Sequence, residues 1–173
     1  LIVVIDDSTT NEIKNKIIKY RKIKYYKRKA KSGRGSAVIF GMKKILEESK
    51  IDLIVEMDTD LSHPPHQLAD LVKIANSEDV DLVICSRDLK GSKITGWPIS
   101  RHMLHFGAVT LCQILLRLGI KDYMNAYRMY SRRAAEIAIK DGGKISTGFW
   151  AFGEVLLHIV NAGYNVKEIP THF

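Results

Sequence analysis

The sequence predicts an α/β fold in which a mostly parallel sheet is flanked by helices. Short apolar runs rich in Val and Ile alternate with stretches of helical length along most of the chain. This alternation is typical of βαβ units, which build parallel sheets. The 173 residues, 46% of them hydrophobic, are enough for one domain with a sizeable core. We therefore expect residues 1–173 to form a single domain.

The first part of the chain predicts two strands, each followed by a helix. The apolar run 1–5 forms a strand that ends in Asp6-Asp7-Ser8, and Ser8 or one of the next two threonines can cap a helix to about residue 20. Residues 23–26 form a short second strand. The segment 31–37 contains two glycines and opens a helix through about residue 48. Glycines at a helix start let a backbone approach a phosphate closely, but a lone Gly-x-Gly is weak evidence for such a site.

The stretch 51–65 is predicted to bring two acidic side chains to the end of a buried strand. Residues 51–57 favour a strand and are interrupted only by two acidic residues. The run stops at Asp58-Thr59-Asp60, and Pro64-Pro65 prevents further pairing. Ligands of open α/β sheets bind at the carboxyl ends of strands. We therefore expect Asp58 and Asp60 to lie at a ligand-binding edge.

Two neighbouring carboxylates repel each other unless a cation lies between them. Mg²⁺ and Mn²⁺ commonly bind one or two carboxylates together with the phosphates of a substrate. The alternative is that the two aspartates only cap the following helix, and the residues alone support both interpretations about equally. His63 and His66 could also be metal ligands, but a histidine beside Pro-Pro at a helix start is more often structural.

The second half of the chain begins with a helix, 66–76, and a strand, 81–86, that ends in Ser86-Arg87. We expect Arg87 to share a sheet edge with Asp58, because both follow buried parallel strands that should be neighbours. A polar loop closed by Trp97-Pro98 comes next. The remaining predicted elements are helices 99–118, 131–140 and 149–161 and a strand, 164–170, with no element assigned to 122–130.

Helix 99–118 has more apolar surface than one core-facing stripe needs. The excess either lies on a membrane surface or against a partner, or is buried on two sides. Trp97 favours the first possibility, because tryptophan prefers the interface between membrane and water. We expect this helix to lie at a bilayer surface with Arg101 close to a lipid phosphate.

The net charge of +8 is concentrated in residues 13–46, which contain no acidic residue. Such a stretch attracts phosphate in a nucleotide, a nucleic acid or a lipid surface. For most of these residues a solvated face is the better interpretation, and we expect the loss of one charge, such as that of Arg28, to change little. Nucleic-acid binding is the alternative from another functional class, because tyrosines are interleaved with the basic residues, but no recognised motif accompanies them.

Cys85 and Cys112 lie in apolar runs without the spacing of a metal site. They predict buried thiols in a reducing compartment. The sequence contains no signal peptide and no apolar stretch of about 18 residues that would span a membrane.

Motifs along nearly the whole chain occur in one order: Val3-Val4-Ile5-Asp6-Asp7-Ser8, the Gly33/Gly35 turn, Met57-Asp58-Thr59-Asp60-Leu61-Ser62-His63-Pro64-Pro65, Ser86-Arg87, Gly96-Trp97 with Arg101, Asp122 with Tyr127-Arg128, and Glu154 with Glu168-Ile169-Pro170. This order resembles glycosyltransferase family 2, and within it the dolichol-phosphate (polyprenyl-phosphate) mannose synthases. The Asp-x-Asp-Leu-Ser-His-Pro-Pro motif and the Gly-Trp loop are specific to that branch.

The resemblance implies a GT-A nucleotide-diphospho-sugar transferase fold. It also implies the inverting, metal-dependent transfer of mannose from GDP-mannose to dolichyl or polyprenyl phosphate by a peripheral protein at the cytoplasmic face of a membrane. Nucleic acid is not an implied partner. By motif, Asp6 and Asp7 would contact the nucleotide, and Asp58 and Asp60 would hold Mg²⁺ or Mn²⁺. The implied catalytic residues are Asp60, Arg87 and Arg101; Arg87 would also bind the donor, and Arg87, Arg101 and Arg128 would bind the lipid phosphate.

The resemblance further implies a piece of a longer protein. Relatives carry a strand with a Pro-x-Tyr-Asn-Glu motif before the Asp6-Asp7 strand, and Arg and Lys residues after the last strand. We therefore expect a catalytic domain truncated at both ends, with a membrane anchor in a missing C-terminal segment or in a separate subunit. A polyprenyl-phosphate glucosyltransferase that uses UDP-glucose is the second possibility, because donor base and sugar follow only from the resemblance. A catalytically silent scaffold is disfavoured, because the aspartates and arginines of the implied site are all present.

Overall fold

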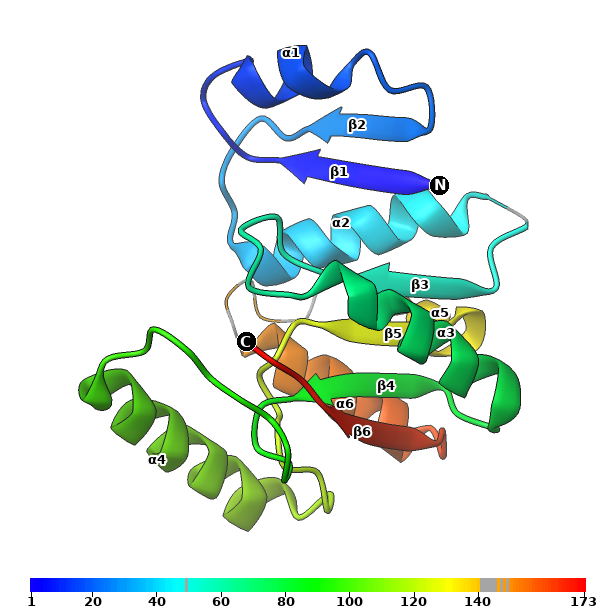
Figure 1. Cartoon of the computed structure of the whole chain (residues 1–173). Helices are drawn as coiled ribbons and strands as arrows, with labels where there is room; N and C mark the ends of the chain where they lie inside the picture. The colour runs from blue at the N-terminus through cyan, green and yellow to red at the C-terminus, as the bar shows by residue number, and fades with distance from the viewer. Residues whose placement is uncertain (49, 141–145, 147, 149) are drawn as a thin grey trace.

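The computed structural model describes the chain except residues 49, 141–145, 147 and 149. Its strands are covered by helices on both faces (Figure 1). The elements in chain order are β1 (Ile2–Asp6), α1 (Glu12–Ile17), β2 (Ile23–Lys27), α2 (Arg34–Leu46), β3 (Leu53–Glu56), the 3₁₀ helix η1 (Pro65–Gln67), α3 (Leu68–Ser77), β4 (Leu82–Ser86), α4 (Ile99–Leu116), β5 (Arg128–Ser131), α5 (Arg132–Lys140), α6 (Ala151–Asn161) and β6 (Val166–Pro170).

The strands form a parallel pair, β1-β2, and a larger sheet of order β3-β5-β4-β6. The predicted α/β class is confirmed, but one expectation about the sheet is wrong. The strands before Asp58 and Arg87 are not neighbours, because β5, for which no element was predicted, lies between them and is antiparallel to both. Since β3 and β4 are each antiparallel to β5, they still run in the same direction. Their carboxyl ends therefore lie at the same edge of the sheet.

The larger sheet has a hydrophobic core on each face, and the side chains of β4 contribute to both cores. Leu82 and Ile84 pack with residues of α2, α5 and α6, whereas Val83 and Cys85 face the core that contains Leu71 of α3. This two-sided burial explains why β4 is apolar without alternation. Helix α2 contacts both β1 and β3 and so links the two sheets. The two cysteines are free and buried, as predicted.

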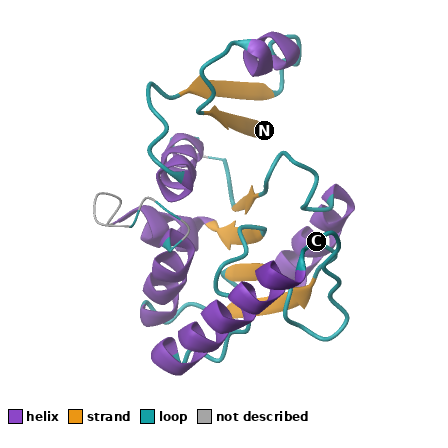
Figure 2. Cartoon of the chain, turned by 90° about the vertical axis from the view of Figure 1, so that its left-hand side faces the viewer, coloured by secondary structure: helices purple, strands orange, loops and turns teal. Residues whose placement is uncertain are grey.

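Helix α4 lies along the outside of the domain, as Figures 1 and 2 show. Only Val109 and Cys112 of its residues are buried. The exposed large apolar side chains of this helix are Ile99, Met103, Leu104, Phe106, Leu111, Ile114 and Leu115. The interpretation that this helix is buried on two sides is therefore wrong. In the part of the chain that the structure describes, no helix combines the length and apolarity needed to span a bilayer.

Candidate active site

A pocket of about 230 Å³ lies at the shared carboxyl edge of β3 and β4. Four of the predicted site residues line it: Asp58 and Asp60 from the loop after β3, Arg87 from the end of β4, and Arg101 from the first turn of α4. The other lining residues are Arg34, Ser62, His63, Met124, Asn125, Ala126 and Phe173. Asp6, Asp7 and Arg128, which were also predicted as site residues, are not part of this lining.

The loop after β3 is held by its own side chains. Ser62 donates hydrogen bonds to Asp60 Oδ1 from its amide (3.0 Å) and its hydroxyl (2.6 Å), and these bonds lower the pKa of Asp60. The Asp58 amide donates to His63 Nδ1 at 2.8 Å. His63 is buried and stacks on Tyr127 with ring centroids 4.9 Å apart, and burial lowers its pKa. His63 thus holds the loop after β3 in place through this hydrogen bond, which agrees with the expectation that it is structural and not a metal ligand.

Asp58 and Asp60 are the two carboxylates among the lining residues of the pocket. Within residues 1–173, the gaps named above excepted, no group of three or more His, Cys, Asp or Glu side chains is placed to hold a metal ion. A divalent ion held by Asp58 and Asp60 would have to take its other ligands from a substrate or from water.

Arg34 is a pocket residue that the sequence did not single out. Its guanidinium contacts Asp58 Oδ1 and lies over the ring of Phe152, 5.3 Å from the centroid. Arg34 is the first residue of α2, directly after Gly33, whose φ of 87° is unfavourable for other residues. From the sequence, the Gly33/Gly35 turn was a weak candidate for a place where the backbone could approach a phosphate. The position of Arg34 between these two glycines is the feature of the sequence that could have identified it as a site residue.

The second glycine of the turn is required by packing. A Cβ on Gly35 would lie 2.4 Å from the Cβ of Ala151, at the start of α6. The start of α2 therefore packs directly against the start of α6, and this close contact fixes where the Arg34 side chain begins.

Arg87 is held by a carboxylate of the protein. It binds Asp122 through Nε and Nη2, both at 2.8 Å, and its own amide donates to Asp122 at 3.0 Å. Burial raises the pKa of Asp122, but the hydrogen bonds from Arg87 outweigh this, so the pKa is lowered overall. Glu168 accepts the amides of Lys121 and Asp122 at 2.8 Å and so anchors this segment to β6. Because the two-point face of Arg87 is engaged, only its remaining N–H groups are available to a ligand.

Arg101 has a different environment. It is exposed, its guanidinium lies 4.2 Å from the ring centroid of Trp97, and no carboxylate of the described chain forms an ion pair with it. The same ring lies near Arg87 and makes an edge contact with Phe173. His105, one turn further along α4, binds Asp88 at 2.9 Å. Trp97 and the His105–Asp88 pair thus attach the start of α4 to the pocket.

Arg128 does not reach the pocket, and its assignment to a lipid phosphate is corrected here. Its side chain is fully buried. The guanidinium donates to three backbone carbonyls, those of Tyr123 (2.7 Å), Asn125 (2.7 Å) and Phe152 (2.8 Å). With these donors engaged inside the protein, Arg128 holds the start of β5 against α6. It is therefore not part of the candidate site.

Asp6 and Asp7 end β1 and have separate surroundings. Asp6 is buried and accepts from Tyr25 Oη (2.6 Å) and the Ser8 amide (2.7 Å). Burial raises its pKa, but these bonds prevail and lower it overall. Asp7 binds Arg28, which also donates to Ser36 (2.7 Å) and to the carbonyl of Gly33.

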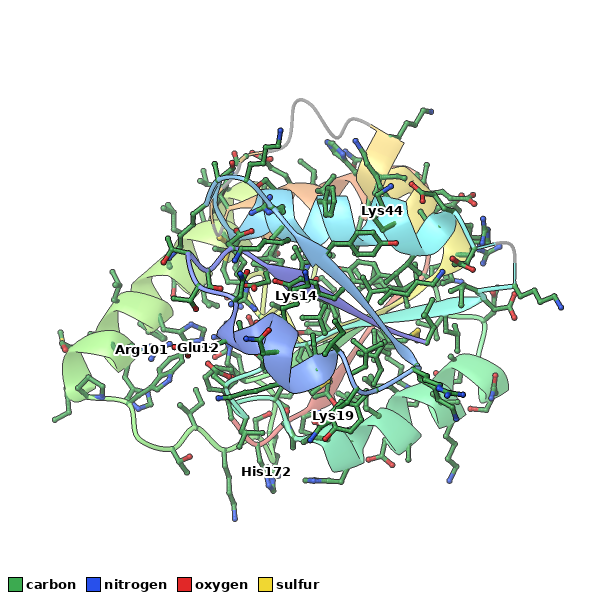
Figure 3. All side chains as sticks on the ribbon, turned by 90° about the horizontal axis from the view of Figure 1, so that it is seen from above. Glu12, Lys14, Lys19, Lys44, Arg101 and His172 are labelled. Carbon is green, nitrogen blue, oxygen red and sulfur yellow. The ribbon has the colours of Figure 1, made fainter. Side chains whose placement is uncertain are left out.

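Arg28 is therefore not one solvated charge among many, and the premise on which its loss was expected to change little is wrong. It connects the ends of β1 and β2 with the start of α2, and 11% of its side chain is exposed. Other basic residues do lie on the surface. Lys14 and Lys19, labelled in Figure 3, are exposed in and just after α1. None of the lysines among the described residues lines the pocket.

The fold matches that of nucleotide-sugar transferases of the GT-A type. Two crystal structures with 16% sequence identity superpose on 98% of the chain: a mycobacterial protein, with a TM-score of 0.65 over 55% of its length, and the glucosyl-3-phosphoglycerate synthase of Mycobacterium tuberculosis in complex with Mn²⁺, UDP and glucosyl-3-phosphoglycerate, with a TM-score of 0.63 over 57% of its length.

The chain belongs to glycosyl transferase family 2, whose family model matches residues 1–137. It is 34% identical over 147 residues to the undecaprenyl-phosphate mannosyltransferase of Micrococcus luteus and 33% identical over 146 residues to the polyprenol monophosphomannose synthase of Mycolicibacterium smegmatis. Each alignment covers 84% of this chain and, respectively, 58% and 54% of the relative. The chain thus spans little more than half the length of these relatives.

Proposed function

We propose that this chain is the catalytic part of an enzyme that transfers mannose from GDP-mannose to a dolichyl or polyprenyl phosphate, with inversion at the sugar, and releases GDP. One observation carries the proposal: a pocket lined by two carboxylates and three arginines lies directly beside an exposed apolar helix. Phosphate-binding groups and a lipid-compatible surface are thereby combined. The names of the two relatives support mannose as the sugar and a polyprenyl phosphate as the acceptor.

The transfer requires little proton chemistry from the protein. A lipid phosphate is ionised near neutral pH, so one of its oxygens can attack the anomeric carbon while the bond to GDP breaks. The protein must bring two phosphate groups together and stabilise the departing GDP. Arg101, exposed beside Trp97, would bind the lipid phosphate, and Arg87 would add positive charge at the pocket wall. Asp6 and Asp7 remain assigned to the nucleotide.

Asp58 and Asp60 would hold Mg²⁺ or Mn²⁺. Both line one pocket, carboxylate oxygens suit these ions, and the lowered pKa keeps Asp60 ionised. An ion held there would supply Lewis-acid stabilisation of the departing diphosphate. The glucosyl-3-phosphoglycerate synthase structure contains Mn²⁺ together with UDP, which supports the use of a divalent ion on this fold.

The choice of donor is tested with a panel of GDP-mannose, UDP-glucose and other nucleotide sugars, each with polyprenyl phosphate and the purified protein. We expect transfer from GDP-mannose in the presence of Mg²⁺ or Mn²⁺ and its loss with a chelator. Transfer from UDP-glucose alone would replace the proposal with a polyprenyl-phosphate glucosyltransferase. No transfer from any donor, together with salt-sensitive binding of nucleic acid, would assign the chain to another class.

Helix α4 is proposed to dock on the membrane surface, at the cytoplasmic face. Burying one large apolar side chain is worth about 1.5–3 kcal/mol, so the exposed residues of α4 provide enough surface for peripheral binding. An anchor elsewhere in the protein or in another subunit would add to this attachment.

Replacing Met103 and Phe106 together by Ser should weaken binding to vesicles by at least about tenfold, because the two side chains are 70% and 73% exposed. Vesicle flotation measures the change. Val72→Ser is the matched control, because Val72 is an exposed apolar residue of α3 and its loss should have little effect. Unchanged flotation of the double variant would assign the α4 surface to a protein partner.

A further inference from the structure

The carboxylate proposed as a metal ligand already has a cation in contact with it. The guanidinium of Arg34 touches Asp58, and both side chains line the pocket. Their side chains are 28% and 27% exposed, so the pair lies at the pocket wall and not in the core. Exposed ion pairs contribute little to stability, whereas separating a fully buried pair is costly. The contact between Arg34 and Asp58 can therefore be exchanged for another one without disturbing the fold.

The backbone that carries Arg34 is held firmly in place. Gly33 has a positive φ, Gly35 packs closely against Ala151, and Arg28 binds the carbonyl of Gly33 and the hydroxyl of Ser36. The guanidinium is at the end of a long side chain that lies over Phe152. A fixed start and a long side chain would let the guanidinium reach more than one partner within the same pocket.

A second acidic residue, Glu56, lies two positions before Asp58 in the chain. Glu56 ends β3, and its Oε1 atom is buried and accepts no hydrogen bond from the described residues. Its other oxygen accepts from Tyr130 Oη at 3.2 Å.

We propose that Arg34 is a displaceable counter-ion. In the ligand-free protein its guanidinium pairs with the carboxylate of Asp58, and when Asp58 binds a divalent ion the guanidinium binds the diphosphate of the donor instead. This inference rests on the proposed function. The charges support it, because a divalent ion would balance the two carboxylates of Asp58 and Asp60 and leave the charge of Arg34 for the negatively charged diphosphate of the donor. Arg34 would thus act as a positioning residue that prevents the two aspartates from binding metal without substrate.

The test measures two affinities in the purified protein, that for Mn²⁺ alone by electron paramagnetic resonance and that for GDP in the presence of saturating Mn²⁺ by calorimetry. Arg34→Met should bind Mn²⁺ alone about tenfold more tightly, because a charge-assisted hydrogen bond no longer competes for Asp58. The same variant should bind GDP about tenfold more weakly, because the diphosphate loses its partner. Arg34→Lys keeps the charge and should return both affinities towards the wild-type values.

Arg101→Met is the matched comparison, because it removes a positive charge from the same pocket without a contact to Asp58. It should tighten Mn²⁺ binding by much less than Arg34→Met. Equal tightening in both variants would overturn the proposal, since Arg34 would then be only a background charge. Weakening of both affinities in Arg34→Met would also overturn it, because this result indicates a structural role.

The proposed function and this inference fail in different ways. A wild-type protein that binds neither Mn²⁺ nor GDP would remove the proposed function and the inference with it. A wild-type protein that binds both, with affinities unchanged in Arg34→Met, would remove the inference alone.

Discussion

Asp60→Asn is expected to lower the turnover number of mannosyl transfer by about a hundredfold or more while the protein stays folded. The amide has the shape of the carboxylate, and its oxygen can still accept the two hydrogen bonds from Ser62. What is lost is the negative charge, and with it one of the two carboxylates available to a divalent ion. Because Asp60 lies on an exposed loop, the change should leave the thermal unfolding midpoint nearly unchanged.

The matched control for this variant is Asp52→Asn. Asp52 is an exposed carboxylate just before β3, at the opposite end of the strand from the pocket. Its substitution should leave both turnover and stability as they are in the wild type. Near-normal turnover by Asp60→Asn would remove this carboxylate from the mechanism and leave Asp58 as the one proposed metal ligand.

Arg128→Met should reduce the free energy of unfolding by about 3–5 kcal/mol. Methionine fills much of the same volume but leaves the carbonyls of Tyr123, Asn125 and Phe152 without their donor. It also removes one of the positive charges that act on the buried carboxyl of Glu56. Urea unfolding followed by circular dichroism measures the loss.

A double-variant cycle separates the two causes of this loss. Glu56→Gln in the Arg128→Met background should recover part of the stability, because the buried carboxyl group has then been removed. Arg21→Met, at an exposed position, is the control and should change stability by no more than about 0.5 kcal/mol. A fall of less than about 1 kcal/mol in Arg128→Met would mean that relaxation or water satisfies the three carbonyls.

The α/β class and the edge that carries the pocket could be predicted from the sequence because β3 and β4 have strong local signals. Both are short apolar runs that end in polar residues. Asp58, Asp60 and Arg87 were therefore expected at one edge, and the structure brings them to one pocket together with Arg101, which only the family resemblance had assigned to the site. This prediction depended only on β3 and β4 running in the same direction. It was therefore correct even though the two strands are not neighbours in the sheet.

The strand β5 and the role of Arg128 could not be predicted, because their stabilising contacts are distant in the sequence. The segment before and within β5 contains Asp122, Asn125 and Arg128, polar residues that normally mark a loop. All three are buried here, since each is paired within the protein. The partners of Arg34 and Arg28 were hidden for the same reason, because single charges in a basic stretch do not reveal which of them meets a carboxylate.

The position of Arg101 in the first turn of α4 has a consequence for how an acceptor would be selected. A docked helix would set the pocket at a fixed height above the bilayer, close to the level of lipid headgroups. The isoprenoid tail could then stay among the other lipids, and the protein would need to recognise little more than the phosphate. Choice among tail lengths would be left to the composition of the membrane, and two-dimensional diffusion of the acceptor would replace a tight binding site for it.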